Sequence, residues 1–318
     1  PLPASIGRVC PHPCQTACRR GIVDDSVSIA WLKYFAADID LAKDEPFMPE
    51  IKPDTGKSIA IIGGGPSGLS AAYYLRSQGH SVTIYEAMPE FGGMLKYGIP
   101  LYRLPKEVLL SEIDIIRNMG VELKPNVRIG KDVSLSYLRE KYDAVYIGGG
   151  NTAMDAARTS IRLGAKEVYV IYRRTKEDMP AVDVEIVEAE EEGITFKFLL
   201  NPIEFIGDEN GRVKQIRLQK MEVVGGGADG RKKVVPVEGE EEILDVDSVI
   251  MSIGQRLKGD GFEELELNKG GNIVSDPETF MTNLEGVFAG GDATNKGAAI
   301  AIQAIADGKY AARVMDSY

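Results

Sequence analysis

Three glycines at residues 63–68 have a spacing that suits them to hold a phosphate group. The pattern Gly63-x-Gly65-x-x-Gly68 follows an apolar run at residues 59–62 and precedes a segment with helical periodicity that begins at Leu69. Gly63 permits a tight turn and Gly65 lets the backbone approach a pyrophosphate. Gly68 allows close helix packing, and the helix N-terminus adds partial positive charge. Strand, loop and helix in this order predict a dinucleotide-binding loop.

A carboxylate after the next apolar run narrows the choice of dinucleotide. Glu86 follows the strand-like residues 81–85 and lies 18 residues beyond Gly68. A carboxylate at this place can accept hydrogen bonds from a ribose diol. It would repel a ribose 2′-phosphate, so this loop favours the adenosine of FAD or NAD over that of NADP.

A second loop repeats the pattern with a different ending. Gly148-x-Gly150-x-x-Ala153 leads into a helical segment, and the apolar run that follows it ends in Arg173 and Arg174. Two guanidinium groups at the ribose end of such a strand match a 2′-phosphate by charge and geometry. The pair favours NADPH, with a solvated basic edge as the alternative.

Near the C-terminus, an acidic residue lies between a predicted strand and a predicted helix. Gly291 and Asp292 follow the apolar run 287–289, and the helix is expected to start near Ala298. An aspartate here can bind the ribityl hydroxyls of a flavin, and the helix N-terminus can stabilise a reduced flavin ring. A helix-capping role for Asp292 is the alternative.

The composition argues against two classes of protein. The 318 residues include 37 Lys and Arg against 48 Asp and Glu, and the net charge of −11 disfavours a nucleic-acid surface. No apolar run reaches the ~20 residues of a membrane-spanning helix, so we expect no membrane span. Only two histidines, His12 and His80, are present, which disfavours histidine-based catalysis. We expect a cofactor to carry the chemistry.

All three cysteines, Cys10, Cys14 and Cys18, lie within the first 18 residues. The remaining residues cannot form a disulfide framework, which favours a reducing, cytoplasmic compartment. The chain begins at Pro1, so a targeting signal ahead of it stays open. A disulfide reductase of the thioredoxin reductase type needs a Cys-x-x-Cys near its flavin. The body of the chain has no cysteine, so the sequence argues against this class of enzyme.

Several long segments together resemble one family. They are GRVCPHPCQTAC at 7–18, GGGPSGLSAAYYL at 63–75, EAMPEFGGMLKYGIPLYRLP at 86–105, GGGNTAMDAARTSIRLGA at 148–165, YRRTKEDMPA at 172–181 and FAGGDA at 288–293. The chain resembles the small (beta) subunit of NADPH-dependent glutamate synthase. The same module is similar to parts of dihydropyrimidine dehydrogenase and of NADH-dependent ferredoxin:NADP oxidoreductase. The resemblance covers nearly the whole chain and does not separate these members.

The resemblance implies a reaction and a set of residues. A hydride would pass from NADPH to FAD, and electrons would leave through iron–sulfur centres to a large catalytic subunit or a ferredoxin-like acceptor. A non-turnover, FAD-binding assembly subunit and a ferredoxin:NADP oxidoreductase-type subunit stay open as alternative functions. Assembly into a homo-oligomer also stays open. The implied FAD residues are Gly63, Gly65, Pro66, Ser67, Gly68, Glu86, Gly93, Met94, Arg103, Val127, Gly291 and Asp292. The implied NADPH residues are Gly150, Asn151, Thr152, Ala153, Arg173, Arg174, Ile253 and Gly254.

The chain departs from this family at two places. In the family, one strand closes the FAD domain and a separate strand enters the NADPH loop, whereas here both roles fall on one run that ends at Gly148 and Gly149. One strand of about six residues cannot serve two sheets, so we expect a missing segment at this junction. The family also uses further cysteines upstream, and Cys10, Cys14 and Cys18 do not complete a four-ligand [4Fe-4S] cluster alone. Cluster remnants, an intact cluster, a zinc site with His12 and free thiols are the open readings.

The predicted fold class is α/β, with two Rossmann-like dinucleotide-binding domains. An N-terminal helical segment with the cysteines and a linker would cover residues 1–54. The FAD-binding domain would comprise residues 55–148 and 256–318, with the NAD(P)H-binding domain, residues 149–255, inserted in it. Within the inserted domain, residues 194–250 are predicted to form antiparallel strands, with a hairpin tip at residues 225–230.

Overall fold

A computed structural model describes residues 1–149, 157, 160–179, 183–226, 232–252, 261–294 and 300–318. Its residues divide into two compact units. The first comprises Pro1–Thr152 with Gly254–Tyr318, and the second comprises Ala153–Ile253. By this division the cysteine-bearing segment belongs to the first unit, and the chain leaves that unit once and returns to it once.

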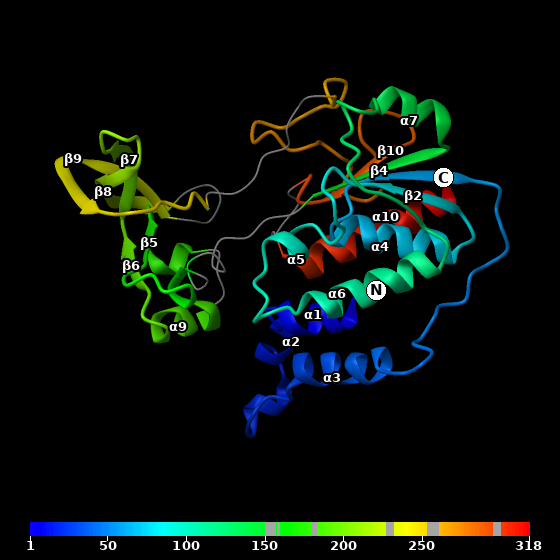
Figure 1. The fold of residues 1–318 in the computed structure, drawn as a ribbon, viewed down its shortest axis with the longest axis horizontal. Coiled ribbons are helices and arrows are strands. Elements are labelled where there is room, and N and C mark those ends of the chain that lie inside the picture. The colour runs from blue at the N-terminus through cyan, green and yellow to red at the C-terminus, as the bar shows by residue number, and fades with distance from the viewer. Residues whose placement is uncertain (150–156, 158–159, 180–182, 227–231, 253–260, 295–299) are drawn as a thin grey trace. The chain divides into compact units, whose positions relative to one another are not determined.

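The first unit is built on a five-stranded parallel sheet with the order β10-β4-β1-β2-β3 (Figure 1). Apart from the half-buried Leu123, the apolar residues on these strands are almost fully buried, as expected for a parallel sheet that is covered on both faces. The strands are β1 (Ser58–Ile62), β2 (Ser81–Tyr85), β3 (Glu122–Lys124), β4 (Ala144–Gly149) and β10 (Val287–Gly291).

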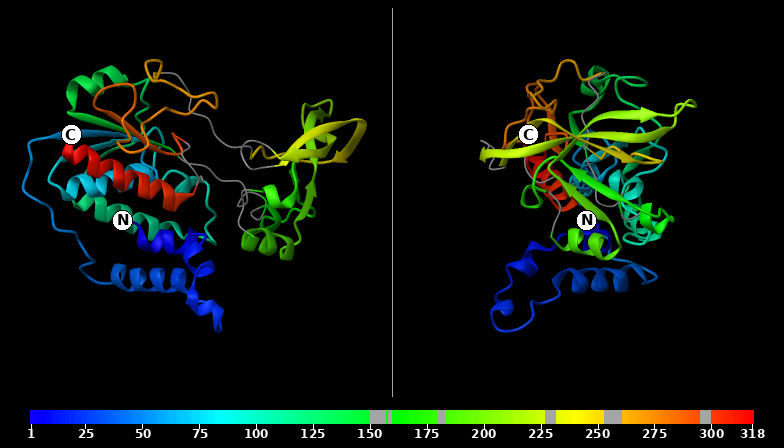
Figure 2. Two further views of the ribbon diagram at one scale, coloured as in Figure 1. Left: turned by 180° about the vertical axis from the view of Figure 1, so that it is seen from behind. Right: turned by 90° about the vertical axis from the view of Figure 1, so that its left-hand side faces the viewer.

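Two apolar clusters lie on the two faces of this sheet. One joins Ile61, Ile84 and Tyr146 to helices on the same face, where α4 and α10 lie side by side (Figures 1 and 2). The other joins Val145 and Val287 to α7 and to the chain around residues 262–273. The helices of the sheet layer are α4 (Pro66–Ser77), α5 (Met94–Tyr97), α6 (Lys106–Asn118), α7 (Leu135–Lys141) and α10 (Ala301–Ser317).

A buried carboxylate attaches the N-terminal segment to this layer. Glu112 of α6 accepts hydrogen bonds from the backbone N–H groups of Ala4 (2.7 Å) and Ser5 (2.9 Å), which are unsatisfied donors at the start of α1. Burial raises the pKa of Glu112, and the two N–H groups oppose that rise. Arg8 forms a two-pronged ion pair with Asp38 and so joins α1 to α3. The segment contains α1 (Pro3–Val9), α2 (Pro13–Thr16), η1 (Arg19–Ile22) and α3 (Ile29–Leu41).

The second unit contains two small sheets. One is the parallel pair β5-β6, and the other is the antiparallel sheet β7-β8-β9. Ile186, Ala189 and Ile194 are the buried core of the first, and Leu200, Ile216 and Leu218 are that of the second. The elements are β5 (Tyr169–Tyr172), η2 (Lys176–Asp178), α9 (Asp183–Glu191), β6 (Thr195–Phe198), β7 (Leu200–Gly207), β8 (Val213–Gly226) and β9 (Lys232–Asp245).

The α/β fold class with parallel sheets is confirmed, and one detail of the prediction is wrong. We expected residues 194–250 to be antiparallel throughout, but β6 pairs parallel with β5, with Tyr169 opposite Thr195. Helix α9 carries the chain back to the start of the sheet, which makes the parallel pairing possible. The predicted hairpin tip at residues 225–230 lies mostly outside the described residues, although Gly226 pairs with Lys232 as a hairpin requires.

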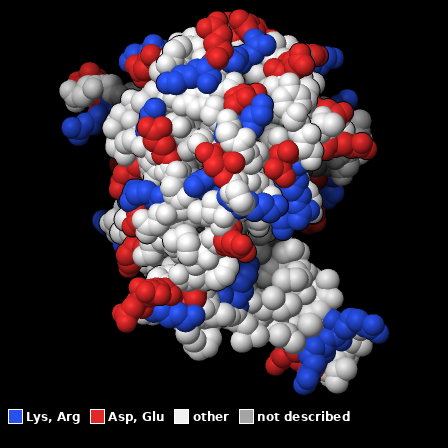
Figure 3. Space-filling view, turned by 90° about the vertical axis from the view of Figure 1, so that its right-hand side faces the viewer, with Lys and Arg blue, Asp and Glu red and all other residues white. Residues whose placement is uncertain are grey.

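The charge distribution on the surface and the lengths of the helices bear on two expectations from the composition, that of no nucleic-acid surface and that of no membrane span. Figure 3 shows Lys and Arg side chains interspersed with Asp and Glu over the face that it presents, without a continuous basic strip. Within the described ranges, each helix is too short or too polar to cross a lipid bilayer.

Candidate functional site

The first glycine loop connects β1 to α4 with the close packing that its sequence predicts. Gly63 has a φ of +97°, which favours glycine, and Gly65 and Pro66 stand at the N-cap and first position of α4. A Cβ added at Gly68 would lie only 2.0 Å from the carbonyl oxygen of Gly63. The loop therefore holds the N-terminus of α4 directly against the end of β1, where backbone N–H groups can meet a phosphate.

Glu86 lies beside this loop at the end of β2. Its carboxylate accepts hydrogen bonds from the backbone N–H groups of Gly64 and Met88, each at 2.8 Å, and the residue is buried. A carboxylate has about four acceptor positions, so two bonds leave capacity for ribose hydroxyls. The N–H of Val127 donates to the carbonyl oxygen of Glu86 at 2.9 Å, which brings another predicted residue to this place.

A second stretch of chain folds over the glycine loop. The N–H of Gly92 donates to the carbonyl oxygen of Gly64 at 2.8 Å. A Cβ added at Gly93, whose φ is +53°, would lie 2.8 Å from the Cα of Gly65. Phe91 is buried, and its ring fills the space next to Gly64 that a side chain there would need.

The predicted residues Met94 and Arg103 follow this stretch. Met94 begins α5, and the N–H of Arg103 donates to the carbonyl oxygen of Pro100 at 3.1 Å in the turn after it. Both are half-buried. They remain predictions as cofactor contacts.

The end of β10 contributes an acidic pair that sequence reasoning identified only in part. Asp307 of α10 is buried, accepts a hydrogen bond from the N–H of Gly291 at 2.9 Å, and accepts another from Gln303 at 2.8 Å. Burial, with the charge of Asp307 as a second cause, raises the pKa of Asp292 to about 6. Sequence reasoning found Gly291 and Asp292 but missed Asp307, whose only signal is an acidic residue before Gly308 in an alanine-rich helix.

Tyr146 joins the glycine loop to the end of β10. Its hydroxyl lies 2.6 Å from that of Ser67, and burial raises its pKa. A Cβ added at Gly290 would lie 2.4 Å from the Tyr146 hydroxyl oxygen, so glycine is required there. Tyr146 was also missed, because on an apolar strand it is indistinguishable from an ordinary core residue.

These residues share one edge of the sheet. The glycine loop, Glu86 and Gly291–Asp292 lie at the carboxyl ends of β1, β2 and β10, and parallel sheets bind ligands at that edge. The close glycine packing and the two carboxylates fit the pyrophosphate and the sugar hydroxyls of a dinucleotide.

The acidic pair predicts a pH dependence of stability in the ligand-free protein. Because the pKa of Asp292 rises on folding from 3.8 to about 6, the folded state binds the extra proton between these pH values. The contribution of Asp292 to stability is therefore present at low pH and is lost as the pH rises towards 6. We expect D292N to gain stability relative to the parent protein between pH 4.5 and pH 7, measured by urea unfolding. If the difference in unfolding free energy between D292N and the parent protein did not change with pH, this prediction would be wrong.

The structure describes only some of the residues that were predicted to bind NADPH. Gly150, Asn151, Thr152, Ala153, Ile253 and Gly254 lie outside the described residues. Arg173 and Arg174 follow the carboxyl end of β5, where Arg173 is exposed and the Nε of Arg174 donates to the carbonyl oxygen of Lys232 at 3.1 Å. The arginine pair thus stands at the predicted end of its strand.

The cysteines do not form a metal site in this structure. Among the residues described, no three His, Cys, Asp or Glu side chains are grouped as a metal ion requires. Backbone N–H groups at Val27, Arg20 and Gly21 lower the pKa of the Cys18 thiol, which favours the thiolate that binds metals. The ligand role of Cys10, Cys14 and Cys18 stays a prediction.

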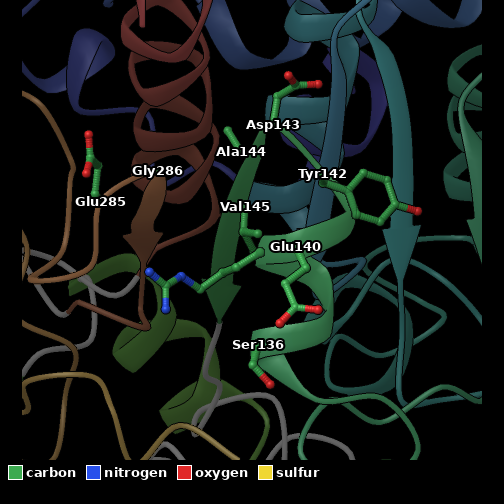
Figure 4. A pocket seen from close by; sticks show the side chains of 9 residues that line it. Ser136, Glu140, Tyr142, Asp143, Ala144, Val145, Glu285 and Gly286 are labelled. Atoms are coloured by element: carbon green, nitrogen blue, oxygen red, sulfur yellow. The ribbon is translucent and has the colours of Figure 1, made fainter.

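A surface depression lies at the opposite edge of the sheet. It has a volume of about 290 Å³, and Figure 4 shows Tyr142, Asp143 and Val145 at the start of β4 among its lining residues. Gly286 precedes β10 on its other side. These are the amino ends of the strands, so the depression is separate from the dinucleotide edge.

Family comparisons agree with the two-loop pattern. The sequence model of the family described as "Pyridine nucleotide-disulphide oxidoreductase" matches residues 121–308. A model described as "NAD(P)-binding Rossmann-like domain" matches residues 61–99, which contain the glycine loop and Glu86.

Individual relatives extend the similarity over the chain. The NADP(+)-dependent formate dehydrogenase subunit beta of Moorella thermoacetica is 37% identical, over 100% of this chain and 54% of its own length. The glutamate synthase [NADPH] small chain of Escherichia coli is 33% identical, over 98% of this chain and 79% of its own length. A structure of FprA from Mycobacterium tuberculosis has a TM-score of 0.71 with 17% identity and covers 84% of each chain, which shows a shared fold. The chain spans about half the length of the formate dehydrogenase subunit.

Proposed function

Because this chain belongs to the pyridine nucleotide-disulphide oxidoreductase family and is of the glutamate synthase small-chain type, we propose that it transfers electrons from NADPH through FAD to a partner protein. One observation carries the proposal. The glycine loop, Glu86 and Gly291–Asp292 come from three separate parts of the sequence and meet at one edge of one sheet.

In this proposal the first unit holds FAD. The N-terminus of α4 and the loop Gly63–Gly68 would bind the pyrophosphate, Glu86 the adenosine ribose, and Asp292 the ribityl chain. FAD supplies the redox chemistry: it accepts a hydride and can release electrons singly. The chain's own residues would bind and align the nucleotides, which agrees with the small number of histidines and the absence of cysteine beyond residue 18.

The second unit would hold NADPH. Arg173 and Arg174 support this assignment, because their guanidinium groups suit a ribose 2′-phosphate. The formate dehydrogenase subunit and the glutamate synthase small chain both carry NADP or NADPH in their names.

Electrons would leave through the N-terminal segment to a partner. Cys10, Cys14 and Cys18 would ligate an iron–sulfur centre that further residues complete. Two relatives are named as a "subunit beta" and a "small chain", which supports a larger partner for this protein as well.

The decisive experiment mixes FAD-loaded protein with NADPH in the absence of oxygen. We expect the yellow flavin absorbance near 450 nm to bleach, because hydride transfer reduces the flavin. Dithionite reduction of the same sample is the control that shows a reducible flavin. A flavin that dithionite bleaches and NADPH leaves unchanged would overturn the proposed electron transfer.

One observation favours a second candidate, a flavin-binding assembly subunit without turnover. Strand β4 is hydrogen-bonded on both edges within the first sheet, to β1 and to β10, although its glycines also begin the second loop. The second unit therefore lacks a strand of its own ahead of that loop in the described chain. The same NADPH experiment separates the two candidates.

A further inference from the structure

Three carboxylates are buried among the described residues: Glu86, Glu112 and Asp307. Glu86 lies beside the glycine loop, and Glu112 attaches α1 to the sheet layer. Asp307, on the second turn of α10, has neither role, although only 7% of it is exposed. A buried carboxylate is costly unless its oxygen atoms accept hydrogen bonds. The partners of Asp307 therefore indicate what it does.

Asp307 holds the turn that follows β10. Its Oδ2 accepts a hydrogen bond from the backbone N–H of Gly291 at 2.9 Å, and its Oδ1 accepts one from the amide of Gln303 at 2.8 Å. Thr294 closes the other side of the turn, because its backbone N–H and its hydroxyl group donate to the carbonyl oxygen of Gly291 at 3.1 Å and 3.0 Å. Asp292 lies inside this turn, so Asp307 helps to fix the backbone that carries Asp292.

The side chain of Asp307 lies where three elements of the first unit meet. A Cβ added at Gly290 of β10 would lie 3.2 Å from the Cβ of Asp307 and 2.4 Å from the hydroxyl oxygen of Tyr146 in β4. A Cβ added at the next helix residue, Gly308, would lie 2.3 Å from the carbonyl oxygen of Ser67 in the first turn of α4. Asp307 is therefore placed to fix the end of β10 relative to the helix that begins at the glycine loop.

The two aspartates also interact through their charges. Burial raises the pKa of Asp292 to about 6, with the charge of Asp307 as the second cause, and no described cation is among the causes. On the neighbouring strand, burial raises the pKa of Tyr146, the hydrogen bond with Ser67 lowers it, and Asp307 adds to the rise. The repulsion between the two carboxylates is thus not offset by a described positive charge.

We infer that Asp307 is a positioning residue of the flavin site. Its buried carboxylate fixes the turn that presents Asp292 to the ribityl chain, and its negative charge sets the pH range over which Asp292 can accept hydrogen bonds from that chain. The inference deepens the proposed function and rests on it, because it takes Asp292 to be a flavin ligand.

Two substitutions separate the hydrogen bonds of Asp307 from its charge. Asp307→Ala removes both and leaves the N–H of Gly291 buried without its partner. Asp307→Asn keeps an oxygen that can accept from Gly291 and removes only the charge. The matched control is Asp316→Asn on the same helix, since Asp316 pairs with His80 at 3.0 Å and lies nine residues beyond Asp307.

The dissociation constant of FAD, measured as a function of pH, is the first readout. At about pH 8 we expect D307A to bind FAD roughly tenfold more weakly than the parent, the factor that corresponds to the loss of one buried hydrogen bond. D307N is expected to keep most of the affinity at this pH. In the parent, affinity should rise with pH as Asp292 ionises near pH 6. In D307N this rise should occur at lower pH, because the like charge is gone, whereas D316N should keep the parent profile.

The second readout needs no flavin. A pKa that folding raises makes the ionised form of Asp292 unfavourable in the folded state, so Asp292→Asn should stabilise the ligand-free parent at pH 7. The same change should stabilise D307N less, because the repulsion that Asp307 adds is already absent. Urea unfolding of the parent, the two single variants and the double variant measures this coupling.

Two results would overturn the role of Asp307. One is the same pH profile of FAD affinity in the parent and D307N, together with an equal gain from D292N in both backgrounds, which would leave Asp307 a merely structural part of the fold. The other is unchanged FAD affinity in D307A. If the parent and every variant failed to bind FAD, the proposed function would be wrong, and the unfolding measurements would still decide whether Asp307 acts on Asp292.

Discussion

Replacement of Gly68 by valine is expected to give a protein that purifies without flavin and does not take up added FAD. The new Cβ would lie 2.0 Å from the Gly63 carbonyl oxygen and 3.1 Å from a methyl group of Ile61. Neither neighbour can move far, because both belong to the end of β1 and its loop. Overpacking of this kind costs typically about 1–3 kcal/mol, and here it would also displace the N–H groups that meet the pyrophosphate.

Flavin absorbance per mole of protein after incubation with FAD measures the effect, and circular dichroism reports whether the fold persists. Gly226→Ala is the matched control, since a Cβ there meets no described atom within 4 Å. Normal flavin content in G68V would show that this loop does not bind FAD.

Replacement of both Arg173 and Arg174 by alanine is expected to weaken NADPH binding about 100-fold and to leave NADH binding nearly unchanged. Hydrogen bonds to charged groups contribute about 1.5–3 kcal/mol each, and 1.4 kcal/mol corresponds to a tenfold change in affinity. Only NADPH carries the 2′-phosphate that the two guanidinium groups would contact.

Dissociation constants for both nucleotides, measured at one ionic strength, test this expectation. Arg162→Ala is the control for the loss of one positive charge on the same unit, where the double variant loses two. Arg162 pairs with Glu192 at 2.7 Å and is not part of the pair at the end of β5. Equal weakening of NADPH and NADH in the double variant would refute the 2′-phosphate assignment.

The parts of the fold that were predictable from sequence are those with strong local patterns. Apolar runs, the glycine loop and helical periodicity from Leu69 onward all agree with one βαβ unit. The structure contains this unit, with its helix starting three residues earlier, at Pro66. The parallel direction of β6 was not predictable, because the four residues of this strand carry no directional information. Direction depends on where α9 returns the chain, which is a tertiary property.

In the candidate site too, the residues with a local sequence pattern were predictable and those that depend on tertiary contacts were not. Gly63, Glu86 and Gly291 could be recognised because each occupies a fixed place relative to its own strand. Asp307 and Tyr146 act on residues 16 and 79 positions away in the sequence, through contacts with Gly291 and Ser67. No local pattern encodes such contacts, since they exist only after α10 and β4 pack against the first loop.

The attachment of α1 by Glu112 has a consequence for the electron exit that the proposed function assigns to the N-terminal segment. Two backbone N–H groups at the head of α1 donate to a single buried carboxylate on α6, so the cysteine-bearing segment is fixed to the sheet layer instead of being tethered by a flexible chain. A redox centre held by that segment would keep a constant tunnelling distance to the flavin. Its rate of reduction would then be insensitive to solvent viscosity, unlike that of a carrier that has to swing between donor and acceptor.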